Sequence, residues 1–157
     1  MDKPPEEQTL IIIKPDAIHR SLLGEIVKRF ERKGLKIVGL KMMEIGDLLL
    51  EDHYAHHKDK PFFASLKDYM QSAPVVVVVL AGFNAIAATR LIVGPTAGYA
   101  ADAGSIRGDF SMSVQSNLVH ASDSAAAAEQ EIKRFFPTGE LFDYQKRDFP
   151  LVYSEYR

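Results

Sequence analysis

One histidine of this chain has neighbours that suit it to covalent chemistry. His120 ends a short apolar run and precedes Ser122, Asp123 and Ser124, residue types that can begin a helix. The Ala-rich segment 125–136 is the predicted helix. An imidazole at a turn from strand to helix is well placed as a nucleophile, because its unprotonated form is reactive near neutral pH and can carry a covalent group. The alternative is a core histidine that is hydrogen-bonded at the end of a strand.

Side chains that could bind phosphate are spread along the chain. The sequence contains neither G-x-x-x-x-G-K-[ST] nor G-x-G-x-x-G, so a phosphate site must use discrete side chains. The candidates are Lys14 at the end of the first predicted strand, Arg90, Thr96 and Arg107. Two of them lie in the segment 94–108, which has neither helical nor strand periodicity. So long a connection is expected to be functional or disordered.

A second pair of histidines has a spacing that can hold zinc. His53 and His57 are four residues apart in a predicted helix. The surrounding HYAHH lacks the glutamate of the H-E-x-x-H motif. A metal-dependent hydrolase on this pair is therefore one hypothesis, and an exposed polar helix is the alternative.

Periodicity predicts alternating strands and helices within one domain, residues 1–157. Runs of β-branched residues predict strands at 9–13 and 75–80, and apolar segments predict two more at 37–43 and 117–120. Helical periodicity predicts helices at 22–33, with Gly34 as the C-cap, and at 48–57, 62–71, 84–93 and 125–136. Residues 1–7 are predicted to be a flexible tail, and residues 137–157 a C-terminal extension without a clear element.

The order of these elements indicates an α+β fold. It matches the ferredoxin-like, split βαβ arrangement, a four-stranded antiparallel sheet with helices on one face. The helical crossovers equally permit a parallel, doubly wound sheet.

The composition excludes several classes of function. The net charge of −2 gives no general reason to bind nucleic acid or an anionic membrane. The absence of cysteine excludes disulfides, thiol catalysis and cysteine-zinc sites. The N-terminus lacks the apolar stretch of a signal peptide, and the longest apolar run, 74–83, is too short for a membrane helix. A cytoplasmic protein is expected.

Several sequence blocks in this order resemble the nucleoside diphosphate kinase family. They are TLIIIKPDAIHR, LLGEIVKRFERKGLKIVGLKMM, HYAHHKDKPFFASLKDYMQSAPVVVVVLAG, IRGDF and NLVHASDS. The resemblance runs from Thr9 to about Tyr144 and implies the ferredoxin-like, antiparallel option. It also implies a ping-pong reaction, in which a histidine takes the γ-phosphate of one nucleoside triphosphate and gives it to a different diphosphate. Mg²⁺ would arrive with the nucleotide phosphates, without a metal site of the protein's own.

The resemblance assigns the catalytic roles by position. It makes His120 the phospho-accepting nucleophile and places Glu131 on the other imidazole nitrogen, where it would fix the tautomer. Ser122 matches a hydroxyl bonded to Glu131. Lys14 and Tyr54 match the pair beside the histidine and the transferred phosphoryl group.

The resemblance assigns the nucleotide contacts in the same way. The phosphate ligands would be Arg90, Thr96, Arg107 and, by a weaker match, His53. Lys14 and Asn117 match contacts to the sugar hydroxyls, and the base would stack on Phe62 between the apolar walls Leu66 and Val114. Stacking tolerates any base, because every base has a π-face, so broad nucleotide use is expected.

Four positions depart from the family pattern without removing a catalytic residue. Ala121 replaces a common glycine, Gly98 and Ala103 replace common prolines, and His56 replaces a common acidic residue. The loop that contains Gly98 and Ala103 helps subunit contacts in the family, so these departures bear on assembly. A homo-oligomer is expected, a hexamer or else a tetramer. The alternative class is a non-enzymatic nucleotide-binding or interaction protein on the same scaffold.

Overall fold

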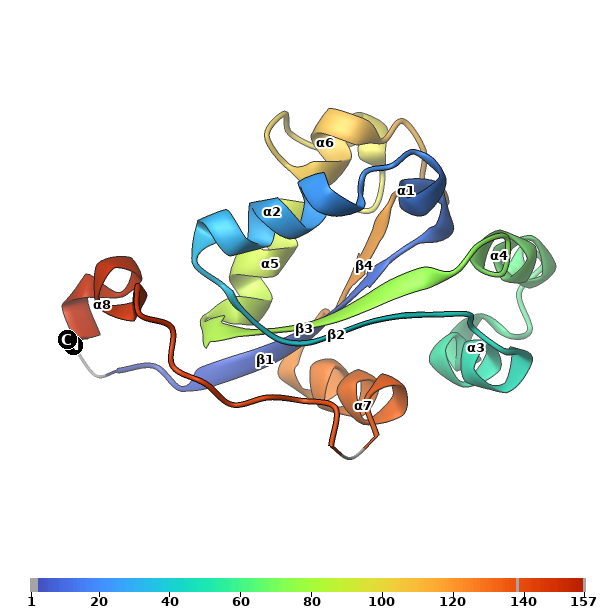
Figure 1. The fold of residues 1–157 in the computed structure, drawn as a ribbon. Coiled ribbons are helices and arrows are strands. Elements are labelled where there is room, and N and C mark those ends of the chain that lie inside the picture. Colours follow the sequence, from blue (N-terminus) through green and yellow to red (C-terminus); the bar gives the residue numbers. More distant parts are fainter. Residues whose placement is uncertain (1–2, 138, 157) are drawn as a thin grey trace.

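The core of the molecule is a four-stranded sheet (Figure 1). The computed structural model describes residues 3–137 and 139–156. The strands are β1 (Glu6–Ile13), β2 (Lys36–Met43), β3 (Val75–Phe83) and β4 (Val119–Ala121), in the order β2-β3-β1-β4. All neighbouring pairs are antiparallel. The predicted antiparallel, ferredoxin-like sheet is therefore confirmed, and the parallel alternative is wrong.

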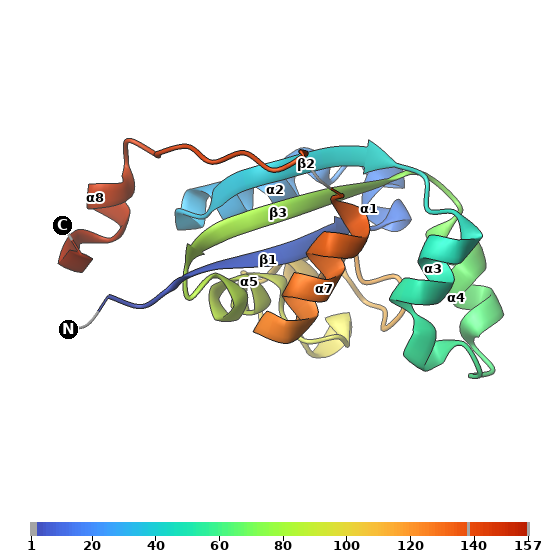
Figure 2. The same ribbon diagram turned by 90° about the horizontal axis from the view of Figure 1, so that it is seen from below.

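Helices cover both faces of this sheet, so the prediction of helices on one face is wrong (Figures 1 and 2). Alternate residues of the central strands β1 and β3 are buried in two separate clusters. Because both faces of these strands are apolar, their sequence does not alternate between polar and apolar residues. The sequence therefore cannot show whether one face of the sheet is open to solvent. One cluster includes α2 (Leu23–Lys33) and α5 (Ala85–Val93), and the other includes α3 (Asp47–His53), α4 (Phe63–Met70) and α7 (Ala125–Phe135).

The remaining elements are short. They are the α-helices α1 (Pro15–His19), α6 (Ile106–Phe110) and α8 (Phe149–Val152), and the 3-10 helices η1 (Ala55–His57), η2 (Gly98–Ala100) and η3 (Ser154–Tyr156). No helix in the described part of the chain is long and apolar enough to cross a membrane.

Several boundaries differ from the predicted ones. The predicted helix 48–57 ends at His53, and a separate 3-10 helix follows. The segment 94–108 is not structureless, because it contains η2 and the start of α6. The strand β1 begins at Glu6, inside the predicted flexible tail, whose first two residues lie outside the described part.

The C-terminal extension runs back along β2. The backbone N–H of Phe142 donates to the Val38 carbonyl (2.8 Å), and the hydroxyl of Tyr144 donates to the Ile37 carbonyl (2.6 Å). Farther on, Tyr153 packs over Gly82, where a Cβ would lie 2.5 Å from the tyrosine hydroxyl oxygen. The extension is thus part of the folded domain.

Candidate active site

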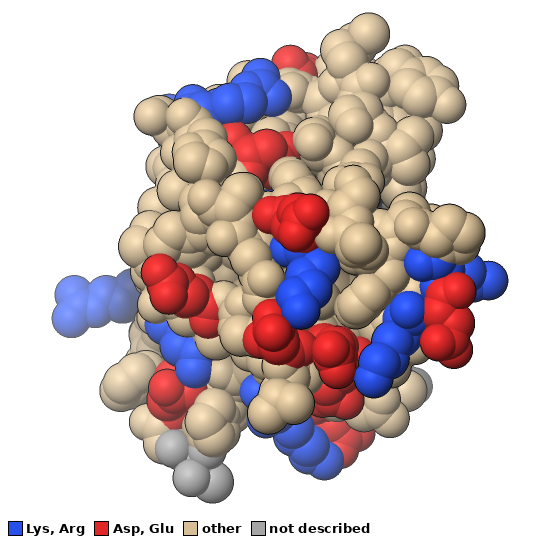
Figure 3. Space-filling view, turned by 90° about the vertical axis from the view of Figure 1, so that its right-hand side faces the viewer, with Lys and Arg blue, Asp and Glu red and all other residues tan. Residues whose placement is uncertain are grey.

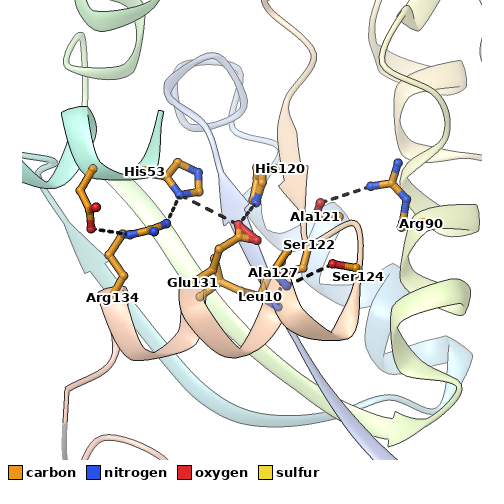
Figure 4. Close-up of polar contacts among 11 residues, drawn as sticks. Leu10, His53, Arg90, His120, Ala121, Ser122, Ser124, Ala127, Glu131 and Arg134 are labelled. Carbon is orange, nitrogen blue, oxygen red and sulfur yellow. Dashed lines mark hydrogen bonds and ion pairs between the residues drawn. The ribbon is translucent and has the colours of Figure 1, made fainter. Parts of the chain in front are cut away.

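The nucleophile candidate lies on the last strand, next to a carboxylate. His120 pairs with Ile12 across the sheet. The hydroxyl of Ser124 accepts from the N–H of Ala127 (3.1 Å), and this N-cap begins α7 at the predicted place. The helix carries Glu131 back to the strand, where its Oε2 lies 2.6 Å from Nε2 of His120 (Figure 4).

This contact fixes the tautomer of His120. A carboxylate can only accept, so Nε2 of His120 carries the hydrogen and donates it to Glu131. Nδ1 is then the nitrogen with the free lone pair, and it has no hydrogen-bond partner within residues 3–137 and 139–156. The predicted pairing of His120 with Glu131 is present in the structure.

His53 lies behind the nucleophile and does not face solvent. Its ring packs edge-to-face on His120 with centroids 4.8 Å apart, and NH1 of Arg134 lies 3.1 Å from its Nδ1. Burial, followed by the positive charges nearby, lowers the pKa of His53 to about 2, so the ring stays neutral. His53 is buried, with 7% of the residue exposed, and its Nδ1 is already in contact with Arg134. The weaker match of His53 to a phosphate ligand stays a prediction.

Tyr54 contributes a buried phenol beside these rings. Its hydroxyl has no hydrogen-bond partner among the described residues. Burial, with the charge of Glu131, raises its pKa, so the phenol keeps its proton at neutral pH. A donor with no partner in a buried site is suited to a ligand oxygen.

The side chains of Lys14 and Asn117 contact each other. The ammonium group of Lys14 donates to Oδ1 of Asn117 (2.8 Å), and Nδ2 of Asn117 donates to the carbonyls of Thr96 (3.0 Å) and Val114 (2.8 Å). Burial, followed by the charge of Arg107, lowers the pKa of Lys14 to about 8. Asn117 therefore joins the backbone at Thr96 and Val114 to the buried Lys14.

The two arginine candidates differ in their surroundings. Arg107 is buried, and its guanidinium donates to the carbonyls of Asn117 (3.2 Å), Gly94 (2.9 Å) and Val119 (2.5 Å). Arg90 is exposed and donates only a 3.3 Å bond to the carbonyl of Ala121. Burial is the main cause that lowers the pKa of Arg107, and the positive charge of Arg90 lowers it further. The two cations therefore lie near each other.

A strained turn precedes the nucleophile. Leu118 has a φ of 75°, a rare conformation for a branched residue. The N–H of Val119 donates to the Asn117 carbonyl (2.9 Å) across it, as in a γ-turn. The N–H of Leu118 donates to Oδ2 of Asp16 (3.1 Å), and the other oxygen of Asp16 accepts from the hydroxyl of Tyr69. These contacts hold the backbone two residues before the nucleophile.

An aromatic rim lies beside this group. The ring of Phe62 is 46% exposed and packs against His57 with centroids 5.1 Å apart. Val114 is exposed, as expected of a wall for a base, whereas Leu66 belongs to the core under α4. His57, which the sequence offered only as a zinc ligand, is thus a neighbour of the proposed stacking residue.

Two sequence-based assignments need correction. The hydroxyl of Ser122 does not bond to Glu131, because it accepts from the N–H of Leu10 (3.1 Å) and donates to the Leu10 carbonyl (3.4 Å). Oε1 of Glu131 is left without a partner among the described residues. The helical His53–His57 zinc pair is also wrong, because the helix ends at His53.

The departures from the family pattern also have a local explanation. Ala121 lies within β4, where extended backbone accepts a Cβ, and it is absent from the positive-φ residues. A Cβ at Gly98 would lie 2.5 Å from the Ser111 carbonyl oxygen, and the Gly98 N–H donates to the Ser113 carbonyl. This loop therefore could not accept proline at Gly98 without rearranging.

One group of side chains has the donor types of a metal site. His53, His120 and Glu131 each offer an atom within 4.8 Å of the others, and they are the one such group among the described residues. All three are already engaged with each other or with Arg134.

On the face where α3 and α4 lie, basic and acidic side chains are interspersed (Figure 3).

Arg134 and Asp16 are the site residues that the sequence reasoning missed. Neither belongs to a motif that predicts a function by itself. The spacing of Arg134 three residues after Glu131 was the signal available, because residues three apart share a helix face.

Comparison with known proteins gives a consistent result. The family model described as nucleoside diphosphate kinase matches residues 7–141. A nucleoside diphosphate kinase of Parabacteroides distasonis is 51% identical over 94% of this chain and 97% of its own length. One from Archaeoglobus fulgidus is 48% identical over 95% and 99%. The structure of a halophilic nucleoside diphosphate kinase from Halobacterium salinarum in complex with CDP superposes with a TM-score of 0.92, at 42% identity, over 95% of this chain and 99% of that one. The chain belongs to the nucleoside diphosphate kinase family.

Proposed function

We propose that this enzyme transfers phosphate between nucleotides through a phosphohistidine on His120. The observation that carries the proposal is the bond from Nε2 of His120 to Glu131, because it leaves Nδ1 as the attacking atom. The direct test is to incubate the protein with γ-labelled ATP and GDP and to look for labelled GTP. Absence of labelled GTP would contradict the proposal.

The transfer divides into two half-reactions. Nδ1 of His120 attacks the γ-phosphorus, the bond from phosphorus to the bridging oxygen breaks, and the electron pair leaves with the nucleoside diphosphate. A second diphosphate then attacks the phosphohistidine with its terminal oxygen, and His120 departs with its electron pair. Glu131 supports the positive charge that the imidazole ring gains in the first step.

The remaining residues neutralise and hold the phosphates. Phosphoryl transfer needs charge on the equatorial oxygens neutralised and the attacking and leaving groups held in line. Arg90 and Arg107 supply forked donors, and two N–H groups of Arg107 remain after its three backbone bonds. Lys14 and Tyr54 donate to the transferred group, and Thr96 contributes to the phosphate contacts. Lys14 and Asn117 also contact the sugar hydroxyls.

The metal that fits this site is Mg²⁺ carried by the nucleotide. Mg²⁺ prefers phosphate oxygen and water and rarely needs an all-protein cage. The side chains proposed for the phosphates are cations, a phenol and a hydroxyl, with no carboxylate among them, so Mg²⁺ would be held by phosphate oxygens and water. When bound, Mg²⁺ would supply further positive charge to the phosphate oxygens.

The proposed substrates are nucleoside di- and triphosphates of any base. The half-exposed ring of Phe62 offers a stacking surface with little hydrogen-bond selection. ADP, GDP, CDP and UDP are all expected to accept phosphate, with purines modestly favoured by their larger π-face. Steady-state kinetics with each diphosphate will measure this, and a strict preference for one base would contradict it. A cytoplasmic location stays a prediction.

Activity is expected to fall at alkaline pH. The pKa of Lys14 near 8 means that the ammonium group is charged at pH 7 and loses its proton as the pH rises through 8. The charge needed at the phosphoryl group is therefore present below pH 8 and lost above it. kcat/KM should fall by about tenfold per pH unit above the apparent pKa of the free enzyme. A profile that stays flat to pH 10 would remove Lys14 from the proposed role.

A homo-oligomer is also proposed, with a hexamer favoured over a tetramer. Family members assemble symmetrically from dimers, and β2 carries exposed Leu40 and Met42. Light scattering at micromolar concentration is expected to give a mass of six chains. A stable monomer would overturn this expectation, and a tetramer would overturn the choice of hexamer.

A further inference from the structure

A guanidinium group lies directly behind the nucleophile. Arg134 follows Glu131 by one turn of α7, and its side chain crosses to the end of α3 (Figure 4). Its Nε donates to Oδ2 of Asp52 (2.7 Å), and NH1 donates to Nδ1 of His53 (3.1 Å). Only 19% of the Arg134 side chain is exposed, whereas Asp52 lies at the surface. The bond to His53 is therefore the buried one of the two.

Two imidazole rings lie within reach of the same carboxylate oxygen. Oε2 of Glu131 is 2.6 Å from Nε2 of His120 and 4.0 Å from Nδ1 of His53. At 4.0 Å the His53 contact is longer than a hydrogen bond, so a hydrogen on Nδ1 of His53 would compete with His120 for this oxygen after a small shift of the side chains. Because Arg134 donates to Nδ1, that nitrogen must act as an acceptor and cannot carry the hydrogen. The neutral His53 ring then holds its hydrogen on Nε2.

We propose that Arg134 is a positioning residue for phosphoryl transfer. It donates a hydrogen bond to Nδ1 of His53, and Oε2 of Glu131 is thereby left to accept from His120 alone. The inference rests on the proposed function of His120 as the nucleophile. Arg134 acts at one remove, because it contacts His53 and not His120 itself. The His53 ring, also packed on Tyr54 and Phe135, is in turn the edge-to-face neighbour of the nucleophile.

The loss of Arg134 should change both the hydrogen position and the chemistry. In Arg134→Leu, Nδ1 of His53 becomes a buried acceptor without a partner, which favours the tautomer that donates to Glu131. The hydrogen bond from Nε2 of His120 to Glu131, which orients Nδ1 of His120, is then weakened. Misplacement of a reacting group can cost up to about 10²-fold, and we expect the rate of phosphohistidine formation to fall about tenfold. Nucleotide affinity should not change, because Arg134 is not among the proposed nucleotide ligands.

The test combines two readouts on matched variants. Single-turnover labelling with γ-labelled ATP gives the rate and the apparent affinity, and ¹⁵N NMR of the histidine side chains gives the tautomer of His53. Arg134→Lys keeps a donor and should restore most of the rate. Asp52→Asn removes the surface ion pair only, and Lys133→Leu removes the neighbouring exposed pair with Glu129. Both controls should keep the wild-type rate and tautomer.

Each outcome decides between the proposals. A folded Arg134→Leu variant with the wild-type rate and tautomer would overturn the role of Arg134, as would equal rate losses in Arg134→Leu and Lys133→Leu. If Arg134→Leu does not fold, the Arg134→Lys variant and the tautomer of His53 carry the test. If the wild-type protein forms no phosphohistidine, the proposed nucleophile fails instead. The tautomer of His53 needs no reaction and separates the two failures.

Discussion

His120→Ala is expected to take up no label from γ-labelled ATP and to lose nucleotide phosphate transfer by at least about 10⁴-fold, because it lacks the atom that accepts the phosphoryl group. The pocket itself should survive. The Glu131 carboxylate would lose its partner, but Lys14, Asn117 and Arg107 keep bonds that do not involve His120. Nucleotide binding by calorimetry should therefore persist while covalent labelling disappears.

The chemistry of the adduct adds a second criterion. A phosphorus–nitrogen bond to imidazole is broken by acid and survives alkali, whereas a serine phosphate behaves in the opposite way. The matched control is His56→Ala, which removes an exposed histidine outside the group around Glu131. It should label fully. Full labelling of the His120→Ala protein would refute the assignment of the nucleophile.

Arg107→Ala is expected to lower kcat/KM by about 10²-fold or more, because it removes a charge that the transition state needs. The structure adds a second expectation. Three backbone carbonyls, of Asn117, Gly94 and Val119, lose their donor together, and a buried acceptor without a partner costs about 1–3 kcal/mol. The Arg107 variant should therefore also melt at a lower temperature.

Arg90→Ala separates these two effects. Arg90 is exposed and makes one long bond, so its loss should lower kcat/KM by a similar factor and leave the melting temperature unchanged. Arg32→Ala, an exposed arginine on α2, serves as the control for both kinetics and melting. Wild-type turnover in either the Arg90 or the Arg107 variant would show that the arginine in question is not a phosphate ligand.

The parts of the fold that could be predicted are those with a strong local pattern. The β-branched run Val75–Val79 strongly favours a strand over a helix, and the structure confirms the predicted strand. The helix that ends at Gly34 is confirmed with the expected left-handed C-cap, at a φ of 103°. The helix after His120 begins at Ala125, where it was predicted, and Ser124 is its N-cap.

The remaining features depend on contacts that no local pattern encodes. The helices α1 and α6 have five residues each, too few for a periodicity to appear. Ser122 bonds to Leu10, more than a hundred residues away, so its partner could not be inferred from neighbours in sequence. Arg134 contacts His53 at the end of α3, and that helix boundary was predicted four residues too late.

The position of β4 in the sheet has a consequence for synthesis of the chain. β1 emerges first, pairs with β3 after about half of the chain has been made, and receives β4 only near the end. Contacts between such distant segments form slowly, because a long loop must close before they can stabilise anything. The edge of β1 that pairs with β4, at Ile11–Ile13, therefore stays unpaired until the chain has grown past residue 119. A chain truncated before residue 119 would lack β4 and His120, the proposed nucleophile, and its unpaired sheet edge would be open to aggregation.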